Sequence, residues 1–268
     1  MIANILTIAG SDSGGGAGIQ ADLKTIAALE CYGLSVITAV TAQNTRSVRA
    51  VHPVPVDIVQ EQLEAVFEDI RIDAVKIGMA CSPAIIDVIV KALQRFKPAH
   101  VVIDPVMVSG AGNLLADADT IVSIRHDLLP MATVLTPNMP EAEVLLGRKF
   151  KGDLEDFAAD LLTLEPRSVF LKGGHVDGRE STDVFANKER SMILNEDKIE
   201  TKNTHGTGCT LSSAMAVYLA KGLPEFEAAA AAKKYVTAAL RHGNDLDVGR
   251  GSGPLNHFFA HWKRGSGV

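Results

Sequence analysis

Short runs of Val, Ile, Leu and Ala alternate with helical apolar spacing along most of this chain. The strand-like runs lie at residues 5–9, 34–40, 74–78, 101–105, 133–138 and 168–172, and helical patterns lie between and after them. Repeated strand–helix units need crossover connections, which place parallel strands in one sheet with helices on both faces. The chain is therefore predicted to be α/β with a mostly parallel central sheet. The more polar, alternating residues 181–199 predict a small antiparallel hairpin at a sheet edge.

Composition limits the number of domains, the classes of partner and the cellular compartment that we expect. The 268 residues are 47% hydrophobic and 22% charged, so we expect one domain over residues 1–262 and a frayed tail at 263–268. A net charge of −6 without a Lys/Arg run argues against nucleic acid and anionic membrane as partners. No apolar run reaches the roughly 18 residues that a membrane helix needs. Three widely spaced cysteines without a CxxC motif indicate a reducing cytoplasm.

Polar and glycine residues gather where the predicted strands end. In open α/β sheets, ligands bind outside the carboxyl ends of the strands. The residues there include Gly10, Asp12, Gln43, Lys76, Met79, Asp104, Val106, Asn138 and Lys172. We therefore expect the functional site at this edge of the sheet.

Residues 203–210, Asn-Thr-His-Gly-Thr-Gly-Cys-Thr, open a helical pattern with two glycines and a cysteine. Gly206 and Gly208 let the backbone turn sharply, and the first amides of the helix can bind an anion. The helix dipole would favour a thiolate at Cys209. One interpretation is a site for chemistry on an anion. The other is an ordinary glycine-rich helix start with a small buried cysteine.

Other motifs also allow two interpretations. Asn138 and Glu141 lie one helical turn apart and can supply oxygen ligands to Mg²⁺, or can form a capping box. Residues 16–21 fit a GxGxxA dinucleotide motif, but the second strand lacks the acid that would hold a ribose. No P-loop motif is present. His257 and His261 have metal-like spacing, yet no third ligand is evident, so we expect a terminal packing helix there.

Together these segments resemble the ribokinase-like superfamily, and within it the hydroxymethylpyrimidine/phosphomethylpyrimidine kinases of thiamine biosynthesis. The resemblance covers nearly the whole chain in order. It is carried by residues 7–12, 14–24, 41–45, 76–79, 136–141, 171–175 and 201–211. It implies a ribokinase-like fold and transfer of phosphate from ATP to the CH₂OH of 4-amino-5-hydroxymethyl-2-methylpyrimidine. A second transfer then goes to the monophosphate.

The resemblance also implies roles for individual residues. Gly206 and Gly208 would form the anion hole for the transferred phosphoryl group, with Cys209 as base or orienting group for the hydroxyl. Lys172 would neutralise phosphate oxygens, while Asp104 and Glu141 would hold Mg²⁺ through water. The expected ATP and phosphate contacts are Thr204, Thr207 and Asn138. The expected substrate contacts are Gly10, Gln43, Met79 and Val106, with Asp22 facing the phosphate of the monophosphate substrate or its Mg²⁺.

One departure and two alternatives accompany the resemblance. Many relatives read Asp-Pro-Ser-Gly-Gly-Ala-Gly where this chain has Asp12-Ser13-Gly14-Gly15-Gly16-Ala17-Gly18, which predicts a looser loop near the substrate. The alternative functions are a pyridoxal/pyridoxine kinase, or an enzyme acting on both substrates, and a non-catalytic ligand-binding relative. The superfamily resemblance further implies a homodimer joined through sheet-edge strands.

Overall fold

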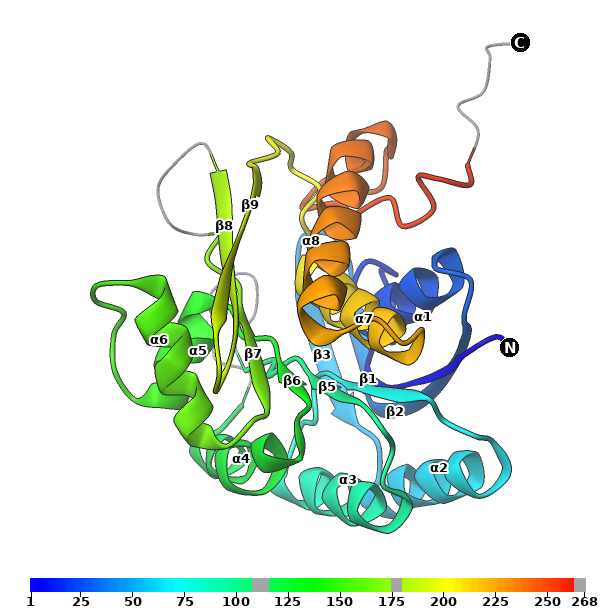
Figure 1. Cartoon of the computed structure of the whole chain (residues 1–268). Coiled ribbons are helices and arrows are strands. Elements are labelled where there is room, and N and C mark those ends of the chain that lie inside the picture. The colour runs from blue at the N-terminus through cyan, green and yellow to red at the C-terminus, as the bar shows by residue number, and fades with distance from the viewer. Residues whose placement is uncertain (108–115, 175–179, 263–268) are drawn as a thin grey trace.

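In the computed structural model, which describes residues 1–107, 116–174 and 180–262, one nine-stranded sheet runs through the molecule (Figure 1). Its order is β3-β2-β1-β4-β5-β6-β7-β8-β9. The predicted α/β class with a mostly parallel sheet is confirmed, whereas the predicted tail at 263–268 lies outside the described residues. The strands are β1 Asn4–Asp12, β2 Tyr32–Gln43, β3 Val48–Pro53, β4 Ala74–Ile77, β5 Val101–Ile103, β6 Val134–Leu135, β7 Ser168–Leu171, β8 Glu180–Asn187 and β9 Ser191–Asp197.

Both edges of the sheet are antiparallel. Strands β2, β1, β4, β5, β6 and β7 pair in parallel, as crossovers through helices require. The predicted hairpin at residues 181–199 is confirmed as β8 and β9. A second antiparallel pair, β2 with β3, lies at the opposite edge and was not expected from the sequence.

Helices cover both faces of the sheet. On one face lie α1 Gly18–Ala28, α7 Thr207–Ala220 and α8 Glu225–Arg241 (Figure 1). The other face carries α2 Val56–Asp69, α3 Pro83–Phe96, α4 Ala118–Ser123, α5 Met139–Leu146 and α6 Leu154–Leu161. Short helical turns are found at Ile124–Leu128, Leu129–Met131, Leu162–Leu164 and His242–Asp245.

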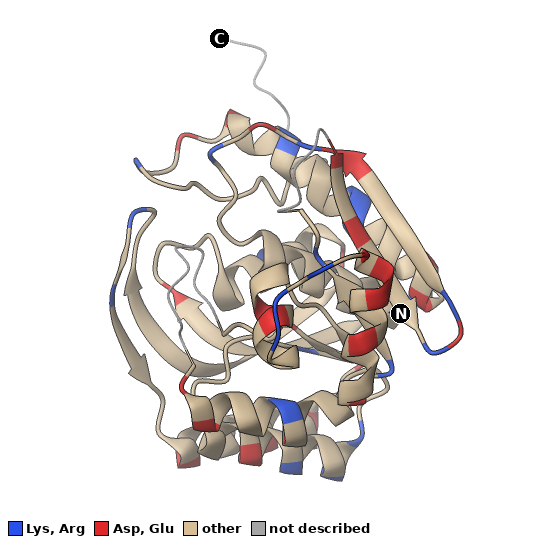
Figure 2. Cartoon of the chain, turned by 90° about the vertical axis from the view of Figure 1, so that its left-hand side faces the viewer, with Lys and Arg blue, Asp and Glu red and all other residues tan. Residues whose placement is uncertain are grey.

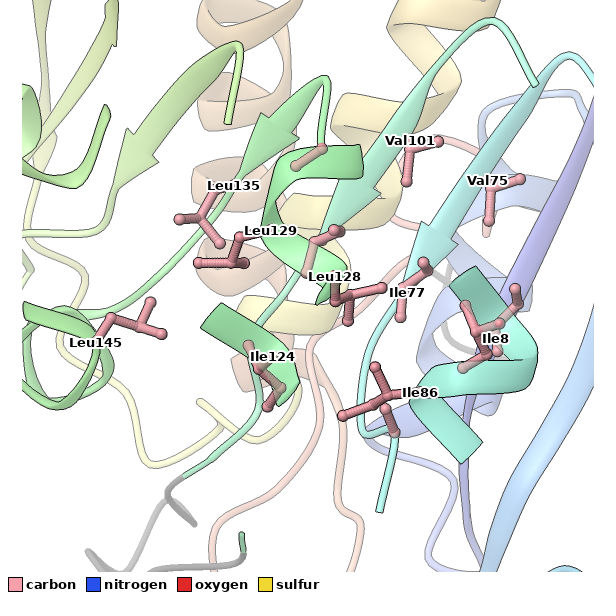
Figure 3. Close-up of a cluster of buried hydrophobic side chains, with 14 of the residues drawn as sticks. Ile8, Val75, Ile77, Ile86, Val101, Ile124, Leu128, Leu129, Leu135 and Leu145 are labelled. Atoms are coloured by element: carbon pink, nitrogen blue, oxygen red, sulfur yellow. The ribbon is translucent and has the colours of Figure 1, made fainter. Parts of the chain in front are cut away.

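The side chains of alternate residues in each central strand pack into two hydrophobic cores, one under each helical layer. Val101 and Ile103 of β5 face the α2–α6 layer, whereas Val102 between them faces α7. Figure 3 shows the first core, where Val75 and Ile77 of β4 lie near Ile86 of α3. Because both faces are covered, these strands are mostly continuous apolar runs, with Thr7 of β1 and Lys76 of β4 as buried polar exceptions.

The outer surface of the helical layer is charged with both signs. Blue and red segments are interspersed along the helices at the bottom of Figure 2. Arg95 of α3 pairs with Glu68 of α2 at 2.8 Å, and both side chains are exposed. Among the described residues, no helix has the length and apolarity needed to cross a membrane.

The predicted terminal helix around His257–His261 is wrong, because these residues form turns. His257 is buried, and its Nε2 lies 3.0 Å from Thr210 Oγ1 of α7. His261 Nε2 instead lies 2.9 Å from the carbonyl oxygen of Ala28. The packing role is therefore right, but the two rings serve separate partners and do not form a metal pair.

Candidate active site

The start of α7 lies against the first glycine-rich loop. Gly206 has φ +87°, and a Cβ at this position would lie 1.8 Å from the carbonyl oxygen of Gly16. Only glycine allows both the left-handed backbone and this approach. The Thr207 N–H donates to the Thr204 carbonyl oxygen at 3.3 Å. Because Gly206 has no side chain to cap α7, the next amides of the first turn can bind another acceptor.

Lys172 and Asp104 lie beside the same helix start. The Lys172 Nζ is 2.8 Å from Asp104 Oδ1, and the Asp104 side chain is only 3% exposed. A Cβ on Gly208 would lie 3.1 Å from Lys172 Nζ and 3.4 Å from Asp104 Oδ2. The ends of β5 and β7 thus meet the glycine turn, which places a cation, an acid and free amides within one small volume.

The Lys172 ammonium is held in its charged form. Burial alone would lower its pKa, but Asp104 and then Glu141 outweigh burial and raise it. A positive charge fixed next to helix amides suits the oxygens of a phosphoryl group.

Asn138 and Glu141 combine the two alternatives that their sequence left open. They form a capping box, because Asn138 Oδ1 accepts from the Glu141 N–H at 2.9 Å and Glu141 Oε2 accepts from the Asn138 N–H at 2.9 Å. Glu141 is also 3% exposed, and burial raises its pKa to about 7 while Lys172 opposes and Asp104 adds to the rise. The cap therefore points an acid into the site.

This donor set fits Mg²⁺. Asp104 and Glu141 are hard oxygen donors, and their mutual repulsion is one cause of the raised pKa of Glu141. A divalent cation near both carboxylates would relieve that repulsion. Among the described residues, no group of three His, Cys, Asp or Glu is close enough to hold a metal ion.

Cys209 lies at the helix start, but the expected preference for a thiolate is wrong. Burial raises the pKa of its thiol to about 11, although Lys76 and a hydrogen bond from the Gly18 N–H act in the opposite direction. Desolvation of the sulfur outweighs the helix dipole that the sequence suggested. In the substrate-free protein the thiol is protonated at neutral pH.

Asp22, which was expected to face the substrate phosphate or its Mg²⁺, is fully buried in this structure. Its side chain is 0% exposed and forms an ion pair with Lys76 at 2.9 Å. Thr7 Oγ1 and Ser213 Oγ donate to the two carboxylate oxygens at 2.6 and 2.8 Å.

The expected pyrimidine contacts are only partly brought together. A Cβ on Gly10 would lie 2.5 Å from Met79 Cε, and Met79 and Val106 line one cavity of about 10 Å³. Gln43 lies elsewhere on the same edge, with its Nε2 3.1 Å from His205 Nε2. In this structure the space beside Gly10 is filled by the flexible methionine side chain, so a flat ring would have to displace it.

Asp12 and His205 form a clamp that sequence reasoning did not assign. Asp12 accepts hydrogen bonds from the N–H groups of Gly14, Gly16 and Ala17, and His205 Nε2 lies 2.9 Å from its Oδ2. Burial raises the pKa of Asp12, but His205 and these amides outweigh it and lower the pKa. The available signal was an aspartate followed by a serine and then by four glycines and one alanine, since such carboxylates commonly bind the amides of the next turn.

The serine in this loop tightens the loop, contrary to the expected loosening. Ser13 Oγ donates to the Gln43 carbonyl oxygen and accepts from the Gln43 N–H, both at 2.8 Å. A proline at this position would have no hydroxyl to make this bridge to the end of β2.

Thr204 and Thr207 form the outer rim of the helix start. Thr207 Oγ1 donates to the Thr204 carbonyl oxygen at 2.7 Å, and Thr204 Oγ1 lies 3.3 Å from Ser252 Oγ. Both threonines thus brace the turn that leads into the anion-binding amides.

Comparison with known proteins identifies the family. Residues 12–256 match the family described as phosphomethylpyrimidine kinase. The chain belongs to this family. It is 48% identical over 266 residues to a hydroxymethylpyrimidine/phosphomethylpyrimidine kinase of Rhizobium meliloti, covering 98% of this chain and 100% of the relative.

Solved structures agree with the fold. A phosphomethylpyrimidine kinase from Clostridium difficile is 45% identical with a TM-score of 0.80, covering 89% of this chain and 99% of that chain. An ADP complex of Bacillus subtilis pyridoxal kinase is 35% identical with a TM-score of 0.90, covering 98% and 100%. The ribokinase-like fold predicted from the sequence is confirmed by these neighbours.

Proposed function

We propose that this protein transfers phosphate from ATP to the CH₂OH group of 4-amino-5-hydroxymethyl-2-methylpyrimidine, and then transfers a second phosphate to the resulting monophosphate. The observation that carries this proposal is the meeting of the glycine turn of α7 with Lys172 and Asp104. Membership of the phosphomethylpyrimidine kinase family selects the substrate class. The products would serve thiamine biosynthesis.

Phosphoryl transfer needs positioning and charge neutralisation more than covalent chemistry. The amides of Gly206 and Gly208 would bind the transferred phosphoryl group, and Lys172 would neutralise its oxygens. Thr204, Thr207 and Asn138 would contact the nucleotide phosphates. Cys209 faces the acceptor hydroxyl and orients it, and its thiolate, the minor form at neutral pH, is the candidate base for the hydroxyl proton.

Two further parts complete the proposed site. Asp104 and Glu141 would hold Mg²⁺ through water, and the ion would supply charge neutralisation to the phosphate oxygens. Gly10, Met79 and Val106 would line the pyrimidine pocket, with Gln43 offering its amide to the ring edge.

Removing the Cys209 sulfur tests the assignment. We expect Cys209→Ala to lower kcat for ADP release by at least about 100-fold, the usual contribution of proton transfer by a positioned group, and to leave pyrimidine binding nearly unchanged. The control is Cys31→Ala, which changes a buried thiol remote from the site. Unchanged turnover in Cys209→Ala would exclude Cys209 as base and as orienting group.

A pyridoxal kinase, or an enzyme acting on both substrates, is the second candidate, supported by the 35% identity to the pyridoxal kinase of Bacillus subtilis. Side-by-side assays with the pyrimidine alcohol, its monophosphate and pyridoxal decide between them. Faster turnover of pyridoxal than of the pyrimidine alcohol would make pyridoxal kinase the preferred function. Binding of the pyrimidine without any ADP release would instead indicate a non-catalytic relative.

We also infer a homodimer in the cytoplasm. Strand β3 is exposed along its whole length, and Val48 and Val51 on it are each 45% exposed, so an edge surface is available for a second copy. Sedimentation at micromolar protein concentration tests the oligomeric state.

A further inference from the structure

A buried polar cluster lies behind the α7 start and has no role in the function proposed above. It consists of Thr7 of β1, Asp22 of α1, Lys76 of β4 and Ser213 of α7, and each of these residues is 0% exposed. Burying a lysine and an aspartate costs free energy that hydrophobic residues of the same size would not, so such pairs commonly serve a purpose other than stability.

The cluster is tied to Cys209 by the pairing of two helices. Cys209 and Ser213 lie one turn apart on α7, and Gly18 and Asp22 lie one turn apart on α1. The Gly18 N–H donates to the Cys209 sulfur, and Ser213 Oγ donates to Asp22 Oδ1 at 2.8 Å. Both contacts join α1 to α7 and lie one helical turn apart, so the Asp22–Lys76 pair lies about one turn of α7 beyond the thiol.

The Asp22 carboxylate accepts four hydrogen bonds inside the cluster. Lys76 Nζ donates to both Asp22 oxygens at 2.9 Å, while Thr7 and Ser213 add one neutral donor to each oxygen. Each carboxylate oxygen of Asp22 therefore accepts two hydrogen bonds, one from Lys76 and one from a hydroxyl group. The ammonium reaches toward the carboxyl end of β4, where a Cβ on Gly78 would lie 3.0 Å from Nζ.

We propose that Lys76, held by Asp22, Thr7 and Ser213, is a positioning residue that supplies a fixed positive charge near Cys209 and stabilises the thiolate when the thiol loses its proton. The role of that thiolate in phosphate transfer rests on the proposed function, but the charge effect does not. The other charged groups facing Cys209 are Asp104 at the end of β5 and Lys172 at the end of β7. Among the influences on the thiol pKa, Lys76 is the largest that favours the thiolate, and Asp22 opposes it less strongly.

Alkylation of Cys209 measures this charge directly. Iodoacetamide reacts with the thiolate, so the pH dependence of alkylation, followed by mass spectrometry on the peptide that carries Cys209, reports its ionisation. The test variant is Lys76→Met combined with Asp22→Asn, which removes both charges together and leaves no unpaired ion. Because Lys76 favours the thiolate more than Asp22 opposes it, we expect an alkylation rate at pH 8 about three- to fivefold lower than in the wild-type protein.

The chain offers a matched control in a second buried pair. Lys233 of α8 donates to Asp183 of β8 at 2.7 Å, and both are nearly buried. The variant Lys233→Met with Asp183→Asn should alkylate at Cys209 within twofold of wild type. Ser213→Ala is a milder second test, because it removes only the hydroxyl group that donates to Asp22. It should lower the alkylation rate of Cys209 by about two- to fivefold.

The outcomes separate this inference from the proposed function. A wild-type alkylation rate in the folded Lys76→Met/Asp22→Asn protein overturns it, and so does an unchanged rate in Ser213→Ala if the double variant does not fold. Loss of kinase activity alone decides nothing about Lys76, since alkylation is measured without substrate. If the protein is active on the pyrimidine, the acid limb of its kcat profile should shift to higher pH in the double variant.

Discussion

Single glycines set the geometry of the site, and two of them allow a controlled comparison. Gly206 and Gly222 both have φ +87°, but a Cβ on Gly206 would lie 1.8 Å from Gly16 O, whereas nothing lies within 4 Å of one on Gly222. We expect Gly222→Ala to destabilise the protein by about 1–2 kcal/mol, the usual cost of the left-handed conformation, with unchanged activity. Gly206→Ala must also push the first glycine loop away, so it should abolish detectable turnover.

Urea unfolding and ADP release on both variants check this comparison. Activity in Gly206→Ala above a tenth of the wild-type value would show that the close approach to Gly16 is not needed for phosphate transfer. A large loss of activity in Gly222→Ala would show that backbone strain alone, far from the site, is enough to impair it.

The acid of the capping box should make stability depend on pH. The pKa of Glu141 is raised to about 7 in the folded protein from an ordinary 4.5, so its contribution to stability is present below pH 4.5 and is lost as the pH rises through 7. Glutamine cannot ionise, so the variant Glu141→Gln should escape this loss. Without Mg²⁺ and ATP, the free energy of unfolding of Glu141→Gln minus that of wild type should therefore be larger at pH 8 than at pH 4.5, on the order of 3 kcal/mol.

Urea unfolding in EDTA at the two pH values measures this gain. The control is Glu143→Gln, since hydrogen bonding to Lys149 lowers the pKa of Glu143 and its removal should give no gain at pH 8. An equal pH response in Glu141→Gln and wild type would refute the raised pKa, and the activity of Glu141→Gln should fall in either case.

At the residue scale, sequence reasoning identified the groups that meet at strand ends but not their protonation or their partners. Lys172, Asp104 and Gly208 were placed correctly because parallel strands bring their carboxyl ends to one edge. The ion pair of Asp22 was not predicted, and Cys209 was described wrongly, because the environment of both is set by Lys76 and by burial. No local pattern shows that residues 22, 76 and 213 share one hydrogen-bonded cluster.

At the scale of elements, the segment after α8 joins α7 to α8 through His257. His257 Nε2 contacts Thr210 of α7, and its carbonyl oxygen accepts from Tyr235 Oη of α8 at 2.8 Å. Burial lowers the pKa of His257 to about 4, so its contribution to stability is present above pH 6.5 and is lost as the pH falls through 4. On acidification from pH 7 to 4, His257→Gln should lose less stability than wild type, by on the order of 3 kcal/mol.

Chemical unfolding of His257→Gln at pH 7 and pH 4 tests this contact, with His52→Gln on exposed β3 as control. If both variants lose as much stability as wild type on acidification, the buried neutral imidazole does not contribute to acid sensitivity.

Elements with strong periodicity were predictable, and those without it were not. The central strands and α2, α3 and α8 follow from continuous or helical apolar spacing. Strand β3 was missed because all six of its residues are exposed, so no buried pattern marks it. The terminal helix was wrong because apolar residues near His257 pack as turns under α7 and α8, which local spacing cannot distinguish from a helix.

For the whole molecule, the fold follows from the sequence more completely than the site does. Because successive residues of a strand point to opposite faces of the sheet, each strand contributes side chains to two cores. The proposed site lies at one edge of the sheet, outside both cores. If residues 1–262 form one domain, as the sequence predicts, they should unfold cooperatively in a single transition. An unfolding measurement on the whole chain tests this prediction.

Substitutions under opposite faces of the sheet provide that measurement. Ile86 lies in the core beneath α3 and Met215 in the core beneath α7, and both are 0% exposed. Each change to Ala should cost about 2–5 kcal/mol, and each should move one common transition, because the central strands contribute to both cores. Calorimetry should give a single peak whose calorimetric and van't Hoff enthalpies agree in all three proteins. Two peaks, with Ile86→Ala moving one and Met215→Ala the other, would show that the layers unfold separately and that the sheet does not couple them.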